Sequence, residues 1–462
     1  MQYEVKPAFE LTFHNYWGII AVDKENNLDG GNSVKKVFGI LLCILLILSP
    51  VLIGCTSTTT PSPSAPATTT QATPTTTAPS TPPASANAPA TIKIGAMLSM
   101  TGPDSTTGIP SQFTFQYAID EINKDGGVFV KSFNKKIPLE LDLKDNQTDP
   151  EKTFAAAEQL NADGCSVVVG TTLAGISANI FEKNKLPLVV SQFDTVGLTR
   201  AGFKYFFDTS KLNSGTVEAI FQMVSSLPKE QVPTKWAFFE EQADWIVELV
   251  EIFKQGAAEN GITFSYQGQY QMLAPDFSQL ILGAKNSGAE VLVGAPTTPD
   301  GINMLKQMQQ LNYHPKAIIF FRAAGDPSWA NLGALGDYVI ESSQWDPSLN
   351  PGDQQVQALI TAYQNKAGSN VPVQGLGPAY ALIQIVSAAI EKAGSLDRTA
   401  IRDAIAATDM TTMEGPTKFD ANGVRMDVPL VVEQWQNGTQ YLVWPRDPKY
   451  NTKPVIWPIP QQ

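Results

Sequence analysis

The chain is poor in the side chains that build disulfides, metal centres and nucleophile–base pairs. It has three cysteines and two histidines in 462 residues. Cys43 and Cys55 belong to an apolar N-terminal region, so Cys165 has no partner for a disulfide in the rest of the chain. The histidines, His14 and His314, cannot make a zinc site between them. These absences argue against a metalloprotein and against a hydrolase that needs a histidine base.

Charged residues are also scarce, at 16% of the chain, and the net charge is −12. Nucleic-acid binding needs clustered Lys and Arg, and the sequence has no such cluster. It also lacks a Gly-x-Gly-x-x-Gly pattern, a phosphate-binding loop ending in Gly-Lys-Ser/Thr, and a Gly-x-Ser-x-Gly elbow. We therefore expect no nucleic-acid partner, no cofactor and no enzymatic activity.

The apolar run at residues 37–48 is shorter than the roughly 20 residues that a membrane-spanning helix needs. It follows Lys35 and Lys36 and leads to Gly54-Cys55. This arrangement resembles a bacterial lipoprotein signal peptide, in which a small residue precedes the lipid-modified cysteine. We interpret residues 34–54 as the signal peptide and Cys55 as the diacylated N-terminus of the mature protein. The alternative is an uncleaved transmembrane anchor.

The segments on either side of the signal peptide are predicted to lie outside the folded core. Residues 1–33 place acidic side chains ahead of the basic start of the signal peptide, and valine codons such as that of Val34 can serve as start codons. We interpret these residues as a mis-called upstream extension. Residues 55–90 are almost entirely Thr, Pro, Ser and Ala, a composition that predicts a disordered, extended tether.

Short apolar runs alternate with amphipathic segments after residue 90. The predicted strands cover residues 92–98, 166–169, 187–190, 236–239, 291–294 and 317–321. The predicted helices cover residues 115–122, 150–160, 174–184, 213–226, 244–259, 276–287, 299–311, 353–366, 379–393 and 397–408. Asp149 is predicted to cap the helix that opens at Pro150. This alternation predicts an α/β fold with helices on both faces of parallel sheets.

The number of alternating units predicts two lobes, because the pattern fills one sheet and starts afresh at Trp236. Ligands of open parallel sheets bind beyond the carboxyl ends of the strands. Polar segments follow the predicted strands at residues 99–102, 170–175, 191–195, 240–245, 295–298 and 322–325. Since most are rich in Thr, Ser, Gly, Asp and Gln, we expect a site for a small polar ligand.

Several of these segments resemble the periplasmic binding protein type 1 family, specifically its leucine/isoleucine/valine-binding branch. The matching motifs are residues 92–103 (IKIGAMLSMTGP), 118–123 (AIDEIN), 145–150 (DNQTDP), 167–170 (VVVG) and 415–423 (GPTKFDANG). The resemblance implies two doubly wound parallel-sheet lobes joined by a three-crossing hinge. Lobe 1 is expected at 91–212 plus 345–412, and lobe 2 at 213–344 plus 413–462.

The resemblance also implies where the ligand is held when the lobes close. Hydroxyl groups and backbone amides of lobe 1 would bind a carboxylate at Thr171, Thr172 and Ala174, with the next loop supplying Gln192, Asp194 and Thr195. The lobe 2 wall would fall at Asn213, Asp244, Trp245, Thr297 and Arg322.

Two of these positions depart from the amino-acid-binding pattern. Asn213 stands where an ammonium-binding Asp is expected, and a neutral amide cannot balance a buried ammonium. Ala174 lacks the hydroxyl of a serine, although Asp194 and Asp244 could restore a carboxylate. The ligand is therefore either a branched-chain or other amino acid, or else an amide, aromatic acid or related polar metabolite. Trp245 could stack on a planar ligand or simply pack on its helix face.

The resemblance implies an extracytoplasmic solute-binding lipoprotein of a bacterial ABC importer. Its partners would be the small-molecule ligand and an ABC permease in the membrane, with a lipid anchor through Cys55 holding a monomeric protein at the cell membrane. A ligand sensor for chemotaxis or amide-responsive regulation is the alternative, because it would use the same fold and the same pocket.

Overall fold

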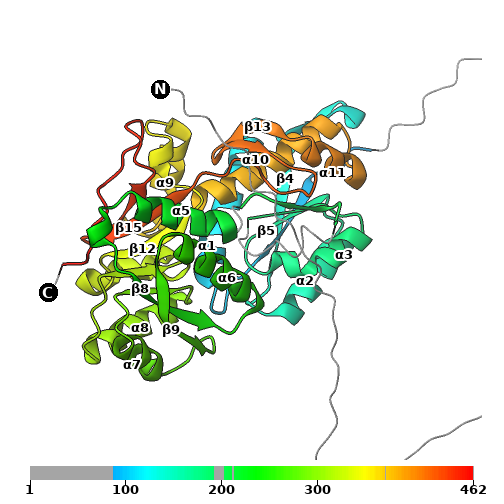
Figure 1. The fold of residues 1–462 in the computed structure, drawn as a ribbon. Coiled ribbons are helices and arrows are strands. Elements are labelled where there is room, and N and C mark those ends of the chain that lie inside the picture. The colour runs from blue at the N-terminus through cyan, green and yellow to red at the C-terminus, as the bar shows by residue number, and fades with distance from the viewer. Residues whose placement is uncertain (1–86, 192–201, 211–212, 370, 461–462) are drawn as a thin grey trace, which may run out of the picture. The chain divides into compact units, whose positions relative to one another are not determined.

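The computed structural model describes residues 87–191, 202–210, 213–369 and 371–460 (Figure 1). These residues belong to one compact unit, Ser80–Gln462. The predicted signal peptide, Cys55 and residues 55–86 of the predicted tether lie outside the described residues, as do Gln192, Asp194 and Thr195. The end of the predicted tether is part of the fold, because Ala88 packs against the core of the first lobe. None of the helices that the structure describes is long and apolar enough to cross a membrane.

The first sheet has, within the described residues, five strands in the order β4-β1-β5-β6-β7, and all neighbouring pairs are parallel. Its strands are β1 (Ile92–Leu98), β4 (Leu139–Asp145), β5 (Val167–Gly170), β6 (Leu188–Val190) and β7 (Phe206–Asp208). Every residue of β5 and β6 is buried. Both faces of this sheet are therefore covered, as its continuous apolar runs predict.

Helices from both halves of the chain cover this sheet. They are α1 (Ser105–Lys124), α2 (Pro150–Ala162), α3 (Ala178–Lys183), α9 (Gln354–Ala367), α10 (Leu376–Ala393) and α11 (Arg398–Ala406). One core contains residues of α1, α9, α10 and α11, and another contains residues of α2 and α3. Figure 1 shows the orange α10 and α11 beside the cyan elements. The predicted cap of α2 is confirmed, because the Asp149 side chain accepts a hydrogen bond from the Lys152 amide.

The second sheet has seven strands in the described part of the chain, in the order β16-β15-β12-β11-β10-β8-β9. They are β8 (Lys235–Glu241), β9 (Thr263–Tyr270), β10 (Val291–Gly294), β11 (Ala317–Phe320), β12 (Val339–Ser343), β15 (Val431–Gln436) and β16 (Thr439–Trp444). The strands β8 to β12 are mutually parallel, whereas β15 and β16 form an antiparallel hairpin. Asn437 and Gly438 both have positive φ at its tip, a geometry that Asn-Gly turns favour.

Four helices pack on the second sheet in the part of the chain that the structure describes. They are α5 (Asn213–Ser225), α6 (Asp244–Glu259), α7 (Ser278–Asn286) and α8 (Thr298–Gln310). Residues of α5 and α6 share one core, and residues of α7 and α8 share the other. The two sheets with their helices form two lobes, which confirms the predicted α/β fold class.

Over the described residues the chain passes between the two sheets three times. It leaves the first sheet after β7, returns after β12, and joins the second sheet again at β15. Two short hairpins complete the fold, formed by β2 (Val128–Val130) with β3 (Lys135–Ile137) and by β13 (Asp409–Thr412) with β14 (Gly415–Lys418). Met413 and Phe419 lie in the core of the first lobe, so the chain stays with that lobe beyond the expected boundary at residue 413.

Candidate functional site

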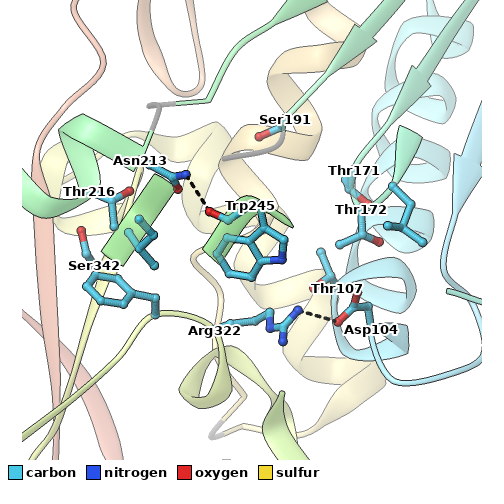
Figure 2. Close-up of a pocket in the computed structure, with 13 residues that line it drawn as sticks. Asp104, Thr107, Thr171, Thr172, Ser191, Asn213, Thr216, Trp245, Arg322 and Ser342 are labelled. Carbon is cyan, nitrogen blue, oxygen red and sulfur yellow. Dashed lines mark hydrogen bonds and ion pairs between the residues drawn. The ribbon is translucent and has the colours of Figure 1, made fainter. Parts of the chain in front are cut away.

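A cavity lies between the two lobes, at the carboxyl ends of several strands (Figure 2). It encloses about 880 Å³ of space free of protein atoms, part of which is open solvent. Its lining residues are Asp104, Thr107, Thr171, Thr172, Leu173, Ser191, Asn213, Thr216, Trp245, Leu249, Phe321, Arg322 and Ser342. Because both lobes contribute, a ligand in this cavity would contact two walls at once.

The wall of the first lobe presents hydroxyl groups that follow β5 and β6. The Ser99 hydroxyl donates to Asn146 Oδ1 at 2.7 Å and lies 2.9 Å from Thr172 Oγ1. Since its proton is already donated to Asn146, Ser99 accepts from Thr172, and the lone pairs of Thr172 are left for a ligand donor. Thr171 Oγ1 is buried and has no hydrogen-bond partner among the described residues. Thr172 can therefore accept a hydrogen bond from a ligand, and Thr171 can either donate or accept one.

The turn after β5, which carries these threonines, contains a strained residue next to Thr172. Leu173 has a φ of 60°, in the left-handed region that non-glycine residues rarely occupy. A glycine is required at position 170, at the end of β5, because a Cβ there would lie 2.5 Å from the Cβ of Ala174. Such strain persists where the surroundings fix the conformation, and it concentrates at binding sites.

The wall of the second lobe is formed largely by α5 and α6. Asn213 Nδ2 donates to the Trp245 carbonyl at 3.5 Å and to Glu248 Oε2 at 3.3 Å, so the amide is held by α6. Thr216 and Leu249 lie one helical turn after Asn213 and Trp245 and line the same cavity. Thr216 Oγ1 is buried and has no hydrogen-bond partner among the described residues. Both walls thus contain an unsatisfied threonine hydroxyl.

Arg322 spans the cavity from the end of β11. Its guanidinium forms an ion pair with Glu241 of its own lobe and lies 3.7 Å from Asp104 of the opposite lobe. It also stands 5.3 Å from the centre of the Trp245 ring, within the range of a cation–π contact (Figure 2). Burial raises the pKa of Glu241, and the attraction of Arg322 opposes that rise. Arg322 Nε is buried without a partner among the described residues, so this guanidinium retains a free donor.

The structure brings together five of the predicted site residues and places others elsewhere. Thr171, Thr172, Asn213, Trp245 and Arg322 line the cavity. Ala174 is fully buried and packs on Gly170 instead of facing the cavity. The Thr297 hydroxyl caps α8, where it bonds to Asp300, and Thr297 does not line the cavity. Asp244 begins α6, and its side chain lies outside the described part, like Gln192, Asp194 and Thr195.

Sequence reasoning missed other lining residues for identifiable reasons. Thr216 and Leu249 could have been found by helical spacing from predicted residues. Asp104 and Thr107 lie at the start of α1, just beyond the predicted strand-end segment at residues 99–102. Ser342 belongs to β12, a strand that the apolar pattern did not reveal.

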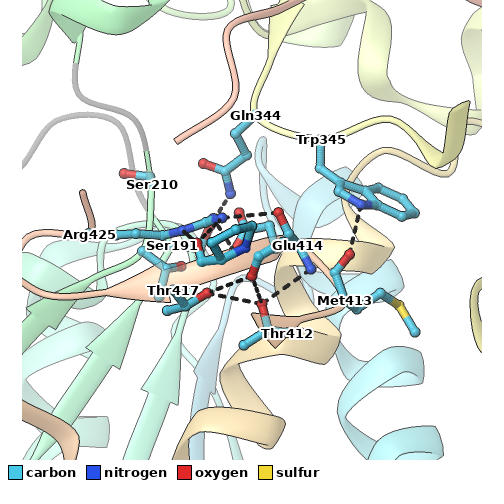
Figure 3. Close-up of polar contacts among 12 residues, drawn as sticks. Ser191, Ser210, Gln344, Trp345, Thr412, Met413, Glu414, Thr417 and Arg425 are labelled. Carbon is cyan, nitrogen blue, oxygen red and sulfur yellow. Dashed lines mark hydrogen bonds and ion pairs between the residues drawn. The ribbon is translucent and has the colours of Figure 1, made fainter. Parts of the chain in front are cut away.

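The chain crossings meet at a buried ion pair (Figure 3). Arg425 Nη1 lies 2.8 Å from Glu414 Oε2, and both side chains are fully buried. The same guanidinium donates to the carbonyls of Glu414 and Pro416. Burial raises the pKa of Glu414 to about 7, since the attraction of Arg425 does not offset it and nearby Asp208 adds to the rise. The Arg425 backbone amide also bonds to the Asp208 carbonyl, which joins the first and third crossings.

The described residues contain no group of three or more His, Cys, Asp or Glu side chains that could hold a metal ion. Cys165 is buried, and burial raises the pKa of its thiol to about 12. A thiol with such a pKa is protonated near neutral pH and is a poor nucleophile. What the cavity offers is therefore binding through hydroxyl groups, an amide, an arginine and aromatic faces.

Comparisons with known proteins agree with this geometry. A family model described as a periplasmic binding protein matches residues 91–440. A relative from Brucella melitensis, named Leu/Ile/Val-binding protein homolog 3, is 25% identical over 318 residues, which are 67% of this chain and 82% of the relative.

Solved structures with the same fold include two that contain different ligands. The branched-chain amino acid transporter substrate binding protein LivJ from Streptococcus pneumoniae, in complex with isoleucine, has a TM-score of 0.66 at 20% identity, covering 77% of this chain and 100% of that one. A solute binding protein of an ABC transporter from Rhodopseudomonas palustris, in complex with 3,4-dihydroxy benzoic acid, has a TM-score of 0.65 at 20% identity. The match covers 77% of this chain and 96% of that one. Identities this low establish a shared fold.

Proposed function

Since this chain belongs to the periplasmic binding protein family, whose members bind solutes and are not enzymes, we propose that it is the substrate-binding protein of an ABC importer. It would capture a small polar solute between its lobes outside the cytoplasm and deliver it to a membrane permease. Branched-chain and other amino acids, amides and related polar metabolites are the candidate ligand classes.

The observation that carries this proposal is the pair of unsatisfied hydroxyls on opposite walls of the cavity. Thr171 Oγ1 belongs to the first lobe and Thr216 Oγ1 to the second, and both are buried without a partner among the described residues. A buried polar group without a partner costs about 1–3 kcal/mol. A ligand that bonds to both groups removes this cost only when both walls contact it, so it favours the closed arrangement of the lobes.

The amino-acid ligand is supported by the names of relatives, whereas the side chains leave room for other solutes. Asn213 lines the cavity where an ammonium-binding carboxylate is expected, and its amide is engaged by α6. Asp194, Thr195 and Asp244 remain proposed contacts. Trp245 both packs against the core of the second lobe and lines the cavity, so it is available to a planar group.

A ligand screen tests the binding proposal. The mature protein is mixed with amino acids, amides and aromatic acids, and its melting temperature is followed. A ligand at one hundred times its dissociation constant adds about 2.7 kcal/mol to the stability of the folded state. The ligand that raises the melting temperature should also reduce the radius of gyration in small-angle scattering. The proposal is wrong if a full panel changes neither quantity.

The proposed lipid anchor is tested separately. Cys55→Ser removes the sulfur that would carry the diacylglycerol, so the variant should move from the membrane fraction to the soluble or unprocessed fractions. Membrane retention of the variant at the wild-type level would indicate an uncleaved anchor instead.

A further inference from the structure

A second cavity adjoins the first at the boundary between the lobes. The two cavities share lining residues, among them Thr171, Ser191 and Arg322, so these residues mark a junction that a ligand in either cavity would reach. The second cavity encloses about 990 Å³ of space free of protein atoms, part of which is open solvent. Gln344 also lines this second cavity. The polar groups at the junction decide which ligand chemistry it accepts.

Gln344 offers a hydrogen-bond acceptor at the junction. It follows β12, is 5% exposed, and donates its amide nitrogen to the hydroxyl of Ser191, which stands just after β6 (Figure 3). This bond joins the chain crossing after β12 to the first lobe, and it holds the amide beside a residue that lines both cavities. The Oε1 atom of Gln344 is buried and has no hydrogen-bond partner among the described residues. It can therefore take a hydrogen bond from a ligand.

Two more polar atoms at the junction have no partner in the part of the chain that the structure describes. They are Arg322 Nε, on the second lobe, and Thr171 Oγ1, on the first, and both are buried. A guanidinium nitrogen can only donate a hydrogen bond, whereas a hydroxyl can donate or accept one. Together with Gln344 Oε1, these atoms give the junction a donor, an acceptor and a group that can be either.

Charged ligand groups satisfy only part of this set. A carboxylate only accepts hydrogen bonds, so it would pair with Arg322 Nε and Thr171 but would leave Gln344 Oε1 without a donor. An ammonium only donates, so it would leave Arg322 Nε without an acceptor and would meet the charge of the guanidinium. A buried polar group that stays unpaired weakens binding. A neutral amide carries both an N–H donor and a carbonyl acceptor, so it can satisfy all three atoms.

Two acids line the second cavity, and neither by itself calls for a cationic ligand. Gln440 Nε2 donates to Glu341 Oε2 at 3.3 Å and to Glu433 Oε2 at 3.1 Å. Burial raises the pKa of Glu433 well above its ordinary value, and nearby Asp346 raises it further, which favours the neutral form of this carboxyl. The cavity is therefore compatible with a neutral group.

We propose that the junction of the two cavities is a subsite for a neutral amide group of the ligand, whose N–H donates to Gln344 and whose carbonyl accepts from Arg322 and Thr171. The inference rests on the proposed solute-binding function and narrows its ligand to molecules that contain a carboxamide or a peptide bond. Gln344 determines the specificity, because its Oε1 is the contact that a carboxylate cannot satisfy.

The experiment compares amides with charged molecules of nearly the same shape, by calorimetry on the mature protein at neutral pH. The sets are benzamide with benzoate and benzylamine, L-glutamine with L-glutamate, and L-leucinamide with L-leucine. We expect at least one amide to bind at least tenfold more tightly than each of its charged partners.

Variants then assign this preference to Gln344. Gln344→Met keeps the length of the side chain and removes the acceptor, so it should lower the affinity for the amide at least tenfold and leave the affinity for the carboxylate partner unchanged. Gln344→Glu keeps an acceptor, which the Ser191 hydroxyl can still bond, so it should retain the preference for the amide over the carboxylate. The matched control, Gln357→Met, changes an exposed glutamine of α9 and should leave both affinities unchanged. Melting temperatures show whether each variant is folded.

The outcomes separate this inference from the proposed function. Binding of an amino acid, a carboxylate or benzylamine without any preference for amides would overturn the subsite and leave the solute-binding function intact. A preference for the amide that survives Gln344→Met would also overturn the subsite, because another residue would then recognise the amide. Failure of every compound to bind would contradict both proposals.

Discussion

The cavity wall of the first lobe is built from hydroxyl groups after strands, whereas the wall of the second lobe carries a buried ion pair and an aromatic ring. Thr171 and Thr172 follow β5 directly. On the other side, Arg322 is held between Glu241 and Trp245. The first wall is held by hydrogen bonds between neutral side chains, such as those of Ser99 with Asn146 and Thr172, whereas the second wall contains a buried ion pair. The difference predicts unequal responses to substitution.

Arg322→Ala should have the largest effect, because it leaves the Glu241 carboxylate, which is 4% exposed, without its cation. We expect the free energy of unfolding to fall by about 3 kcal/mol, as when one partner of a buried pair is removed. Thr172→Ala on the opposite wall should cost only about 1 kcal/mol. Urea denaturation measures both.

The control for Arg322→Ala is the exposed pair of Lys254 and Glu251 on α6. Lys254→Ala should change the free energy of unfolding by less than about 1 kcal/mol. If Arg322→Ala and Thr172→Ala lower the free energy of unfolding equally, the two walls do not differ in their contribution to stability.

The buried pair of Glu414 and Arg425, where the chain crossings meet, tests whether buried charge is also costly outside the second wall. The folded pKa of Glu414 is about 7, against an ordinary value of 4.5. A raised carboxyl pKa means that the folded state binds the proton more tightly, so the contribution to stability is present below about pH 4.5 and is lost as the pH rises through about 7.

Glu414→Gln should therefore flatten the pH dependence of unfolding between about pH 5 and pH 8, whatever its absolute stability. Denaturation curves at several pH values for the wild type and the variant measure the difference. Glu251→Gln, at an exposed position, should keep the wild-type slope. A wild-type slope in Glu414→Gln would show that this carboxyl does not titrate in that range.

The threonine hydroxyls allow the two walls to be compared with the same chemical change. Thr171→Val and Thr216→Val each remove a buried hydroxyl that lacks a partner among the described residues. The empty protein should keep or gain stability, since a polar group without a partner is replaced by an apolar one of the same shape. Each variant should bind ligand about tenfold more weakly, which corresponds to about 1.4 kcal/mol. If only one of the two variants binds the ligand more weakly, the ligand contacts only that wall.

The smallest effect is expected from deletion of residues 56–86, which keeps Ala88 and its contact with the core of the first lobe. These residues contain almost no large apolar side chains, and such a segment does not contribute to a core. A soluble form of the protein without them should keep the melting temperature and ligand affinity of the form that has them. A large loss of either would show that the segment supports one of the walls.

Apolar runs made much of the architecture predictable from the sequence. The predicted strand at 291–294 and the predicted helix at 244–259 match β10 and α6 residue for residue. β9 was missed because its residues alternate between exposed and partly buried positions. β12 was missed because Glu341 and two serines follow only two apolar residues. A continuous apolar run leaves a signal in the sequence, whereas a strand with polar side chains does not, even where it is buried.

The strand ends made part of the site predictable, and the family resemblance added Asn213 at the start of α5. Thr171, Thr172 and Arg322 lie just after apolar strands, and the rule for parallel sheets nominated them. The pairing of β12 with β15, which places Glu341 across from Glu433, joins strands about ninety residues apart, and no local pattern contains that information. Asp104 lines the cavity close to Arg322 of the opposite lobe, a contact between segments far apart in the sequence.

The position of Trp245 makes the intrinsic fluorescence of the protein sensitive to whether the cleft is occupied. Trp236, Trp329, Trp345 and Trp435 are almost wholly buried in the lobes, whereas Trp245 faces the first cavity beside the Arg322 guanidinium. Indole emission responds to the polarity and charge around the ring. A solute that enters beside Trp245 changes that environment while the buried indoles keep theirs. Fluorescence from the unlabelled chain can therefore follow filling of the cleft in real time.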